Sequence, residues 1–395
     1  MIRLLPLMAV AACAGPSPSR APERPRAPEA SPHVESSEPA TASPQPEPGP
    51  DGPFADACPL FDSVLGRVAR SLAERWSSEG RPADASDVDQ LLRQEGSPYV
   101  WSHTWTLAGQ GNLRALAGPR LEAWLASFGD AGERRCGLAV SERSDGRQVV
   151  AAVAVDALAD LEATPARVRV GSWVEVRARM RVPFSSAKVV VLGPRGAPKS
   201  AATSSRGSQV SARFNADAPG AWLVQVLADV EHGPRPVLEA LLTAGKGSRH
   251  DARQREAPGE RTPGFDEAPE QHLLQMLGAA RASEGLAALR PEERLAPLAQ
   301  AQALALRAAG RVAHDLGGGD PAARVAASGL TPQAVGENVA HGATVAAAHR
   351  ALWSSPSHRS NILSEHFDSI GIGVARDSDG SVWVCELFGR FGDDR

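Results

Sequence analysis

The sequence has little excess charge of either sign: 42 Lys and Arg residues stand against 46 Asp and Glu residues, a formal net charge of −4. Nucleic-acid-binding domains usually present a basic face, so this balance gives no support for a nucleic-acid partner. Tyrosine occurs once and cysteine four times. After the first residues, no apolar run is long enough to cross a bilayer as a helix. The 395 residues are enough for two or three domains.

The N-terminus is predicted to be a lipoprotein signal peptide, residues 1–13. One Arg precedes an apolar run that ends in small residues, which is typical of a short secretory signal. The run ends in Val10-Ala-Ala-Cys13, which resembles a bacterial lipobox, and Cys13 would become the lipidated residue. The predicted localisation is secreted and lipid-anchored to the cell envelope, at the outer membrane in a Gram-negative cell. The alternative is an ordinary signal peptide with an incidental cysteine.

Residues 14–52 are rich in Pro, Ser, Ala and Glu and contain almost no aliphatic side chains. Such a segment cannot bury enough apolar area to offset the entropy of ordering it. Its proline density favours an extended chain. We therefore expect a disordered tether that holds the folded part away from a membrane, with the lipid anchor as the only membrane contact.

The states expected for the other three cysteines depend on the oxidising compartment of a secreted protein. Cys58 and Cys136 fall in one predicted domain of a secreted chain, where an oxidising environment favours a disulfide between them. Cys385 lies in a predicted strand, and we expect it to be a small buried apolar residue without chemistry.

Three folded segments are predicted, so the fold class is α+β multidomain. Residues 54–157 combine helical periodicity with a hairpin and form an α+β domain. Residues 160–244 contain short alternating runs separated by Gly and Pro, which predicts a small β-sandwich of immunoglobulin-like size. Residues 245–265 are polar and rich in helix breakers, as in a linker. Residues 266–392 show helices followed by a hairpin, which favours a layered α+β domain.

An internal similarity connects the first and last of these segments. Gly137 to Gly146 and Gly371 to Gly380 align without a gap, and in both cases predicted helices precede and an apolar strand follows. The first segment is therefore expected to be a diverged copy of the last. The alternative is convergence on a common hairpin turn, because Asp-Gly between strands is frequent.

The most informative residues lie in the last segment. Ser355-Pro356 is a helix-start signal that places His358 in the first turn, where the helix dipole disfavours the imidazolium. A neutral imidazole can bind a metal or accept a proton; the alternative is that His358 only supports its own turn. Glu337, between Gly336 and Asn338, is expected to be partly buried and to need a partner. His314, before a glycine loop, would by itself be a surface residue.

These residues belong to an ordered set of motifs that resembles the CAP superfamily (cysteine-rich secretory, antigen 5 and pathogenesis-related proteins) in its bacterial SCP-like form. The set comprises Arg281, Gly285-Leu286, His314, Arg324, Gly336-Glu-Asn-Val-Ala340, Ser355-Pro-Ser-His-Arg359, Asn361-Ile-Leu363 and Gly371-Ile-Gly-Val374. The resemblance implies an α-β-α sandwich with a cleft lined by two His and two Glu, which in several members bind zinc or another divalent cation. His314, Glu337 and His358 match three of these four positions.

The fourth position, a Glu in the preceding helix, falls near Ala346 or Ala347, and His349 is the nearest candidate to replace it. Two His and one carboxylate can still coordinate zinc with water as the fourth ligand. Loss of an orienting carboxylate, however, weakens metal affinity by about 10 to 100-fold. If Glu337 is a ligand, no obvious general base remains for hydrolysis.

Three functions remain open. The first is a binding module for a small apolar ligand, a metal ion or a cell-surface protein, since the family's members are mostly lipid, sterol or protein binders. The second is a metal-dependent hydrolase or peptidase, which the missing acidic residue disfavours, so that a non-enzyme is expected. The third is a structural envelope protein whose cleft residues only hold the fold.

Overall fold

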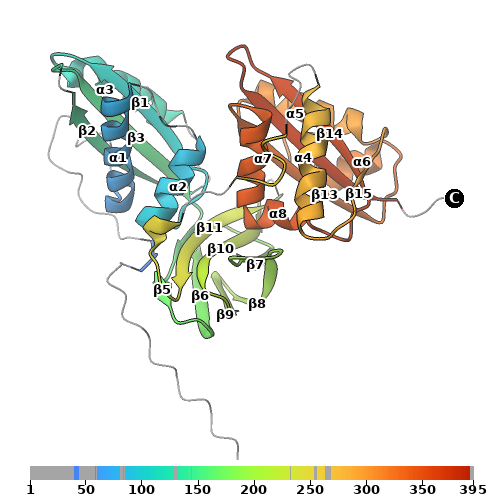
Figure 1. Ribbon diagram of the computed structural model, residues 1–395. Coiled ribbons are helices and arrows are strands. Elements are labelled where there is room, and N and C mark those ends of the chain that lie inside the picture. Colours follow the sequence, from blue (N-terminus) through green and yellow to red (C-terminus); the bar gives the residue numbers. More distant parts are fainter. Residues whose placement is uncertain are drawn as a thin grey trace, which may run out of the picture. The chain divides into compact units, whose positions relative to one another are not determined.

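The computed structural model describes residues 40–43, 58, 60–80, 83, 85–127, 132–143, 145–231, 233–252, 256–262 and 268–391 (Figure 1). The predicted signal peptide, with Cys13, lies outside these residues, as does most of the predicted tether. Its residues 40–43 are described, and there Thr41 is buried and pairs with Thr164 through two backbone hydrogen bonds. No helix among the described residues has both the length and the apolar character needed to cross a membrane.

The first domain is an antiparallel sheet between helices. Its elements are α1 (Ser63–Glu79), α2 (Ala85–Glu95), β1 (His103–Gly109), α3 (Leu113–Ala126), β2 (Glu133–Glu142) and β3 (Gln148–Ala157). The strands lie in the order β1-β3-β2. Alternate residues of β3 point to opposite faces: Val149 and Val153 pack in one core cluster with α1 and α2, whereas Val150 and Ala152 pack in another with α3.

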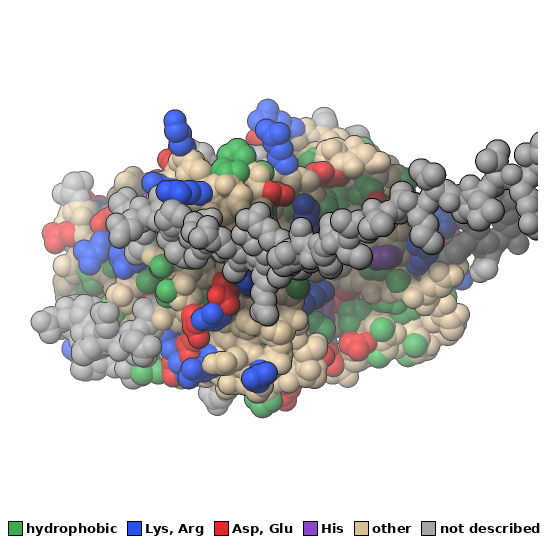
Figure 2. Space-filling model, turned by 90° about the horizontal axis from the view of Figure 1, so that it is seen from below, with side chains coloured by type: hydrophobic (Ala, Val, Ile, Leu, Met, Phe, Trp, Pro, Cys, Tyr) green, Lys and Arg blue, Asp and Glu red, His purple; other side chains and the backbone are tan. Residues whose placement is uncertain are grey.

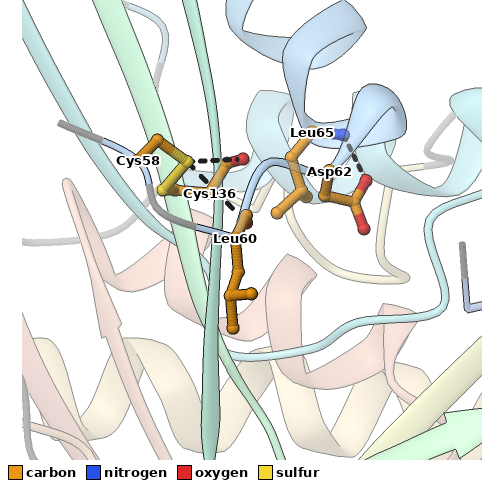
Figure 3. The surroundings of a disulfide bond; sticks show 5 residues. All are labelled: Cys58, Leu60, Asp62, Leu65 and Cys136. Carbon is orange, nitrogen blue, oxygen red and sulfur yellow. Dashed lines mark hydrogen bonds between the residues drawn. A yellow bond between two sulfur atoms is a disulfide. The ribbon is translucent and has the colours of Figure 1, made fainter. Parts of the chain in front are cut away.

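The start of α1 is fixed by a cap and a disulfide (Figure 3). The Asp62 carboxylate accepts hydrogen bonds from the backbone N–H groups of Val64 and Leu65, which would otherwise be unsatisfied at the helix start. Cys58 and Cys136, the two cysteines proposed to pair, are joined by a disulfide. The bond ties the segment before α1 to strand β2.

The central domain is one curled eight-stranded sheet. Its strands are β4 (Ala159–Leu161), β5 (Arg167–Val168), β6 (Ser172–Met180), β7 (Ser186–Leu192), β8 (Lys199–Arg206), β9 (Gln209–Ala216), β10 (Gly220–Val230) and β11 (Gly233–Ala244). They lie in the order β4-β6-β9-β8-β7-β10-β11-β5. The prediction of a two-sheet sandwich is therefore wrong. Strand β8 pairs with both β7 and β9, so the two halves are continuous.

The C-terminal domain is a three-layer α-β-α arrangement. Its elements are α4 (Pro269–Ser283), β12 (Arg290–Pro291), α5 (Ala296–Ala309), α6 (Pro321–Ala327), β13 (Ala334–Gly342), α7 (Val345–Ser354), α8 (Pro356–Ile362), β14 (Ser369–Arg376) and β15 (Val382–Arg390). The sheet order is β12-β14-β15-β13. Val384 and Phe388 of β15 pack with α4 and α7, and Cys385 and Leu387 pack with α5 and α6.

The first and last domains share their strand order and helix placement. The order β1-β3-β2 corresponds to β13-β15-β14, with antiparallel pairing throughout. Gly137 of β2 lies against the backbone of α1 at Leu65, and Gly371 of β14 lies against the backbone before α5 at Leu295. A Cβ atom at either glycine would lie within 2.5 Å of backbone atoms, so only glycine lets the helix approach the sheet this closely.

The hairpin turns of these two domains also have the same hydrogen bonds. The Arg143 N–H donates to the carbonyl of Arg147 at 2.7 Å, and the Asp377 N–H donates to that of Ser381 at 2.8 Å. Gly146 and Gly380 both have positive φ, 76° and 89°. The aligned sequences thus share their fold, from the helix contact through to the turn.

Part of the predicted linker packs on the C-terminal domain. In residues 256–262, Ala257 belongs to the core cluster of α4 and α7, and Glu260 forms a salt bridge with Arg350 of α7. His349, the candidate for the missing fourth cleft position, is buried beneath this segment, with its Nε2 atom 3.3 Å from the Pro258 carbonyl. Burial lowers the pKa of His349 to about 4.

The surface carries charges of both signs. On the face that Figure 2 shows, Lys and Arg side chains are interspersed with Asp and Glu side chains. This mixture agrees with the small formal net charge of the chain, −4.

Candidate functional site

The candidate site lies at β13, an edge strand of the C-terminal sheet. Helix α5 ends at Gly310, whose positive φ of 61° turns the chain into the loop that carries His314. Glu337 and Asn338 are adjacent on β13 and therefore point to opposite faces of the sheet. His358 follows Pro356 in the first turn of α8, as predicted.

Glu337 is fully buried and both of its carboxylate oxygens are engaged. Oε1 lies 2.8 Å from Nδ1 of His314, whose side chain is 23% exposed. Oε2 accepts a hydrogen bond from Nη2 of Arg324. A buried carboxylate requires such compensation. The structure thus brings His314 and Glu337 together and adds a cation that the sequence reasoning gave no role.

Arg324 holds the His314 loop in place. Its Nη1 atom donates to the carbonyl oxygens of His314 at 2.6 Å and Gly319 at 2.8 Å. Since Nη2 of the same guanidinium binds Glu337, one residue of α6 fixes both the backbone of the loop and the carboxylate that orients the imidazole. Its position in the ordered motif set was the only signal for this role.

His358 is half-buried on α8. Burial, and secondarily the charge of nearby His314, lower the pKa of His358 to about 3. Its imidazole is therefore neutral at physiological pH, the form that can bind a metal ion or accept a hydrogen bond. The carbonyl of His358 accepts a hydrogen bond from Nδ2 of Asn338 at 3.2 Å, which attaches α8 to β13.

A second buried acid, Glu386, was missed by the sequence reasoning. It lies on β15 directly opposite Asn338, and its Oε2 atom accepts from Asn338 Nδ2 at 2.9 Å. Asn361 completes the network by donating to Asn338 Oδ1 at 2.9 Å. Oε1 of Glu386 is buried without a hydrogen-bond partner, and burial raises the pKa of Glu386 to about 7. A single acidic residue within the apolar run Val382–Phe388 was the available signal.

Two of the predicted metal ligands, His314 and Glu337, are hydrogen-bonded to each other. Within the part of the chain that the structure describes, no group of three or more His, Cys, Asp or Glu side chains is arranged to hold a metal ion. The oxygens of Glu337 are taken by His314 and Arg324. A carboxylate in this position fits the role of orienting a ligating histidine better than that of a direct ligand. The set His314, Glu337 and His358 as three ligands stays a prediction.

The only described free thiol, Cys385, also contacts Glu337, with Sγ 3.5 Å from Oε2. Burial, reinforced by the nearby carboxylate, raises the pKa of Cys385 well above its ordinary value. The thiolate is the reactive form of cysteine. Cys385 is therefore a packing residue and not a nucleophile.

A cavity of about 300 Å³ adjoins the site. Val339, Ala340, Leu352 and His358 line it from the C-terminal domain. The cavity is large enough for a small organic ligand. Its other walls come from the first and central domains.

Comparison with known proteins decides the family of the last domain. The CAP family, described as the cysteine-rich secretory protein family, matches residues 274–387. These residues form a CAP domain. The match includes His314, Glu337 and His358, so the resemblance read from the motifs is confirmed.

Individual matches to known proteins cover different parts of the chain. An uncharacterized protein of Bacillus subtilis, YkwD, is 28% identical over 130 residues, which cover 32% of this chain and 50% of that protein. This chain therefore spans half the length of that relative. Among solved structures, an outer surface protein from Borrelia burgdorferi is 22% identical, with a TM-score of 0.31, and the match covers 33% of this chain and 97% of that one.

A longer match is to an extracellular SCP-domain protein from Bacillus anthracis. It is 14% identical with a TM-score of 0.30, and the match covers 68% of this chain and 92% of that protein.

Helix α7 of the CAP domain carries no carboxylate, and Ala346 and Ala347 stand where the family resemblance implies a second Glu. His349 does not replace that Glu at the cleft, because its Nε2 atom faces Pro258. Trp353 of the same helix packs under the guanidinium of Arg359, whose Cζ lies 3.7 Å from the ring centroid.

Proposed function

We propose that this protein is a cell-envelope lipoprotein whose CAP domain binds a small ligand or a divalent metal ion. The observation that carries the proposal is the pairing of His314 with Glu337. The carboxylate fixes Nδ1 and leaves Nε2 of the imidazole available, while His358 is held neutral nearby. An oriented imidazole, His314, and a neutral one, His358, are together suited to binding.

If a divalent cation binds, His314 and His358 would hold it, and Glu337 would orient His314. The bound ion would act as a Lewis acid toward a ligand in the adjoining cavity. Arg324 would keep Glu337 in place, since its guanidinium contacts Oε2.

Hydrolysis is the less favoured function. A general base needs a group free to take a proton from water. Glu337 is committed to His314 and Arg324, and Cys385 has a raised pKa. The described cleft residues therefore include groups that can bind a ligand, whereas neither Glu337 nor Cys385 is free to act as a general base.

Titration of zinc into the purified full chain, followed by calorimetry, tests whether the CAP domain binds a metal ion. We expect binding by the wild type that weakens at least tenfold in His314→Ala and in His358→Ala. His366→Ala, which changes a histidine outside the site, is the matched control. Equal zinc binding by all four proteins, or by none, would refute metal binding at this site. Extraction of a co-purified lipid would then favour an apolar ligand instead.

Peptide or casein turnover by the same preparation tests the hydrolase alternative. We expect no turnover above that of a His358→Ala control. Turnover that His358→Ala abolishes would overturn the assignment as a binding protein.

The envelope location is proposed from the sequence and from relatives. Val10 to Cys13 resembles a lipobox, and similar proteins are described as outer surface or extracellular proteins. Labelling of cells with a palmitate analogue should mark the wild type and not Cys13→Ser. Equal labelling of both would contradict the lipid anchor.

We also propose that the first folded segment, residues 54–157, is a diverged copy of the CAP domain that has lost the site. The shared strand order, the Gly137 and Gly371 contacts and the matching turns support this origin. In the register of the two sheets, Thr104 pairs with Val153 as Glu337 pairs with Leu387. The copy thus has a hydroxyl where the CAP domain has its carboxylate, which favours a structural role.

A further inference from the structure

The cavity beside His358 has walls from all three domains. The CAP domain supplies one side through β13, α7 and α8. Opposite them lie Arg93 of α2, Tyr99 and Trp101 of the following loop, and Glu239 of β11. A ligand in this cavity would therefore contact both His358 and residues that lie outside the CAP family match.

The upstream wall is a connected polar network. Glu239 is buried, and its Oε2 accepts from Arg93 Nε at 2.9 Å while its Oε1 accepts from Gln225 Nε2 at 2.6 Å. Oε1 of Gln225 accepts from the N–H of Ser357, the residue before His358. The network thus fixes the position of α8 relative to the cavity.

Trp101 in this wall has an unusual backbone conformation. It is the only non-glycine residue among those described with a positive φ, 60°. This conformation is a genuine outlier for a bulky residue, and such strain clusters at binding sites. Its indole N–H donates to the Pro236 carbonyl at 2.9 Å, which fixes the ring at the cavity.

The charges of the wall indicate the kind of ligand. Two carboxylates, Asp89 and Glu239, line the cavity together with one guanidinium, Arg93. Since Arg93 is paired with Glu239, the wall has an excess of one negative charge. Aromatic faces attract cations, and each ring of this wall already has one from the chain itself: Arg235 Cζ lies 4.8 Å from the Trp101 centroid, and Arg135 Cζ lies 5.6 Å from that of Tyr99. The carboxylate of Asp89 is therefore the group that attracts a cation to the cavity.

We propose that this cavity is a composite site for a small organic cation, an amine with an apolar body. The amine lies toward Asp89, and the apolar part contacts Trp101, Val339 and Leu352. This inference rests on the proposed binding function of the CAP cleft and names its ligand class. The cavity volume, about 300 Å³, suits a ligand of this size.

Three probes of similar shape and different charge test the proposal: 2-phenylethylamine, 2-phenylethanol and 3-phenylpropionate. Binding to the full chain is measured by calorimetry. We expect the amine to bind at least tenfold more tightly than the alcohol, and the carboxylate to bind more weakly than either. Equal affinities, or preference for the carboxylate, would overturn the proposal.

Two variants locate the site. Asp89→Asn should weaken amine binding at least tenfold, whereas Asp217→Asn, an exposed acid of the central domain, should leave it unchanged. Trp101→Gly should also lose amine binding while keeping the fold, since glycine adopts positive φ without strain. Amine binding that survives both substitutions refutes the composite site.

The zinc titration separates this inference from the proposed function. Zinc binding lost in His358→Ala, together with amine binding unaffected by Asp89→Asn, would leave the CAP site standing and remove the composite one. If amine binding depends on Asp89 and the wild type binds no zinc, the composite site is supported and only the proposal of metal binding is refuted.

Discussion

Gln225 of the central sheet caps helix α8 of the CAP domain in place of Ser355. Its Oε1 atom accepts the hydrogen bond of the Ser357 N–H at 3.0 Å. Ser355 occupies the cap position, but its side chain makes no cap hydrogen bond. The helix that carries His358 is therefore completed by a residue from another domain.

Gln225→Ala should destabilise the protein by about 3 kcal/mol, because it removes both the helix cap and the hydrogen bond to the buried Glu239 carboxylate. Urea unfolding measures this change, with Gln209→Ala, an exposed residue of β9, as the control. Hydrogen exchange at the Ser357 amide should also accelerate. An unchanged exchange rate would show that Gln225 does not provide the cap in solution.

Glu337→Gln should destabilise the CAP domain by about 3 kcal/mol, because it leaves the Arg324 guanidinium largely buried without its counter-charge. The control is Glu175→Gln, which breaks an exposed pair with Arg177 and should cost under about 1 kcal/mol. Thermal or urea unfolding of the full chain measures both changes. Similar small losses in the two variants would contradict the pairing.

Glu386 should make stability fall as the pH rises. Its pKa is about 7 in the folded protein against an ordinary value of 4.5, so between these pH values the folded state binds more protons than the unfolded state. At pH 8 the buried charge costs on the order of 3 kcal/mol. Glu386→Gln removes that charge and keeps an acceptor for Asn338.

We therefore expect Glu386→Gln to be more stable than the wild type at pH 8 and similar to it at pH 4.5. Urea unfolding at several pH values measures the difference, in which the contributions of His349 and His358 cancel because both proteins contain them. A constant difference across the pH range would refute the titration of Glu386.

The Cys58–Cys136 disulfide should stabilise the first domain. It closes a loop with a sequence separation of 78 residues, for which restriction of the unfolded chain corresponds to about 4 kcal/mol. Cys58→Ser combined with Cys136→Ser should lower the unfolding midpoint, and reduction of the wild type should have the same effect. No shift in either experiment would show that the bond does not constrain the unfolded chain.

The sequence was most predictive where local signals and packing agree. The Ser355-Pro356 signal begins α8 in the structure, and the expected hairpin forms from β14 and β15. The central domain was misjudged because alternation shows which residues are buried but not which strands pair. Only the pairing of β8 with both neighbours distinguishes one curled sheet from two stacked sheets.

At the site, the motifs indicated which residues matter but not what holds them. The Glu337–His314 contact joins residues 23 positions apart, and the Gln225–Ser357 bond joins residues 132 positions apart. Neither separation produces a periodic signal. Glu386 was visible as an acid in an apolar strand, but its partner could be named only once the register of β13 and β15 was known.

The segment 256–262 determines where the CAP domain can be cut from the rest of the chain. Because Ala257 fills part of its core and Glu260 pairs with Arg350, a fragment that starts at residue 266 would lose both contacts and expose the imidazole of His349 to solvent. An excised domain that begins before residue 256 keeps them, and is the one suited to isolated biophysical work.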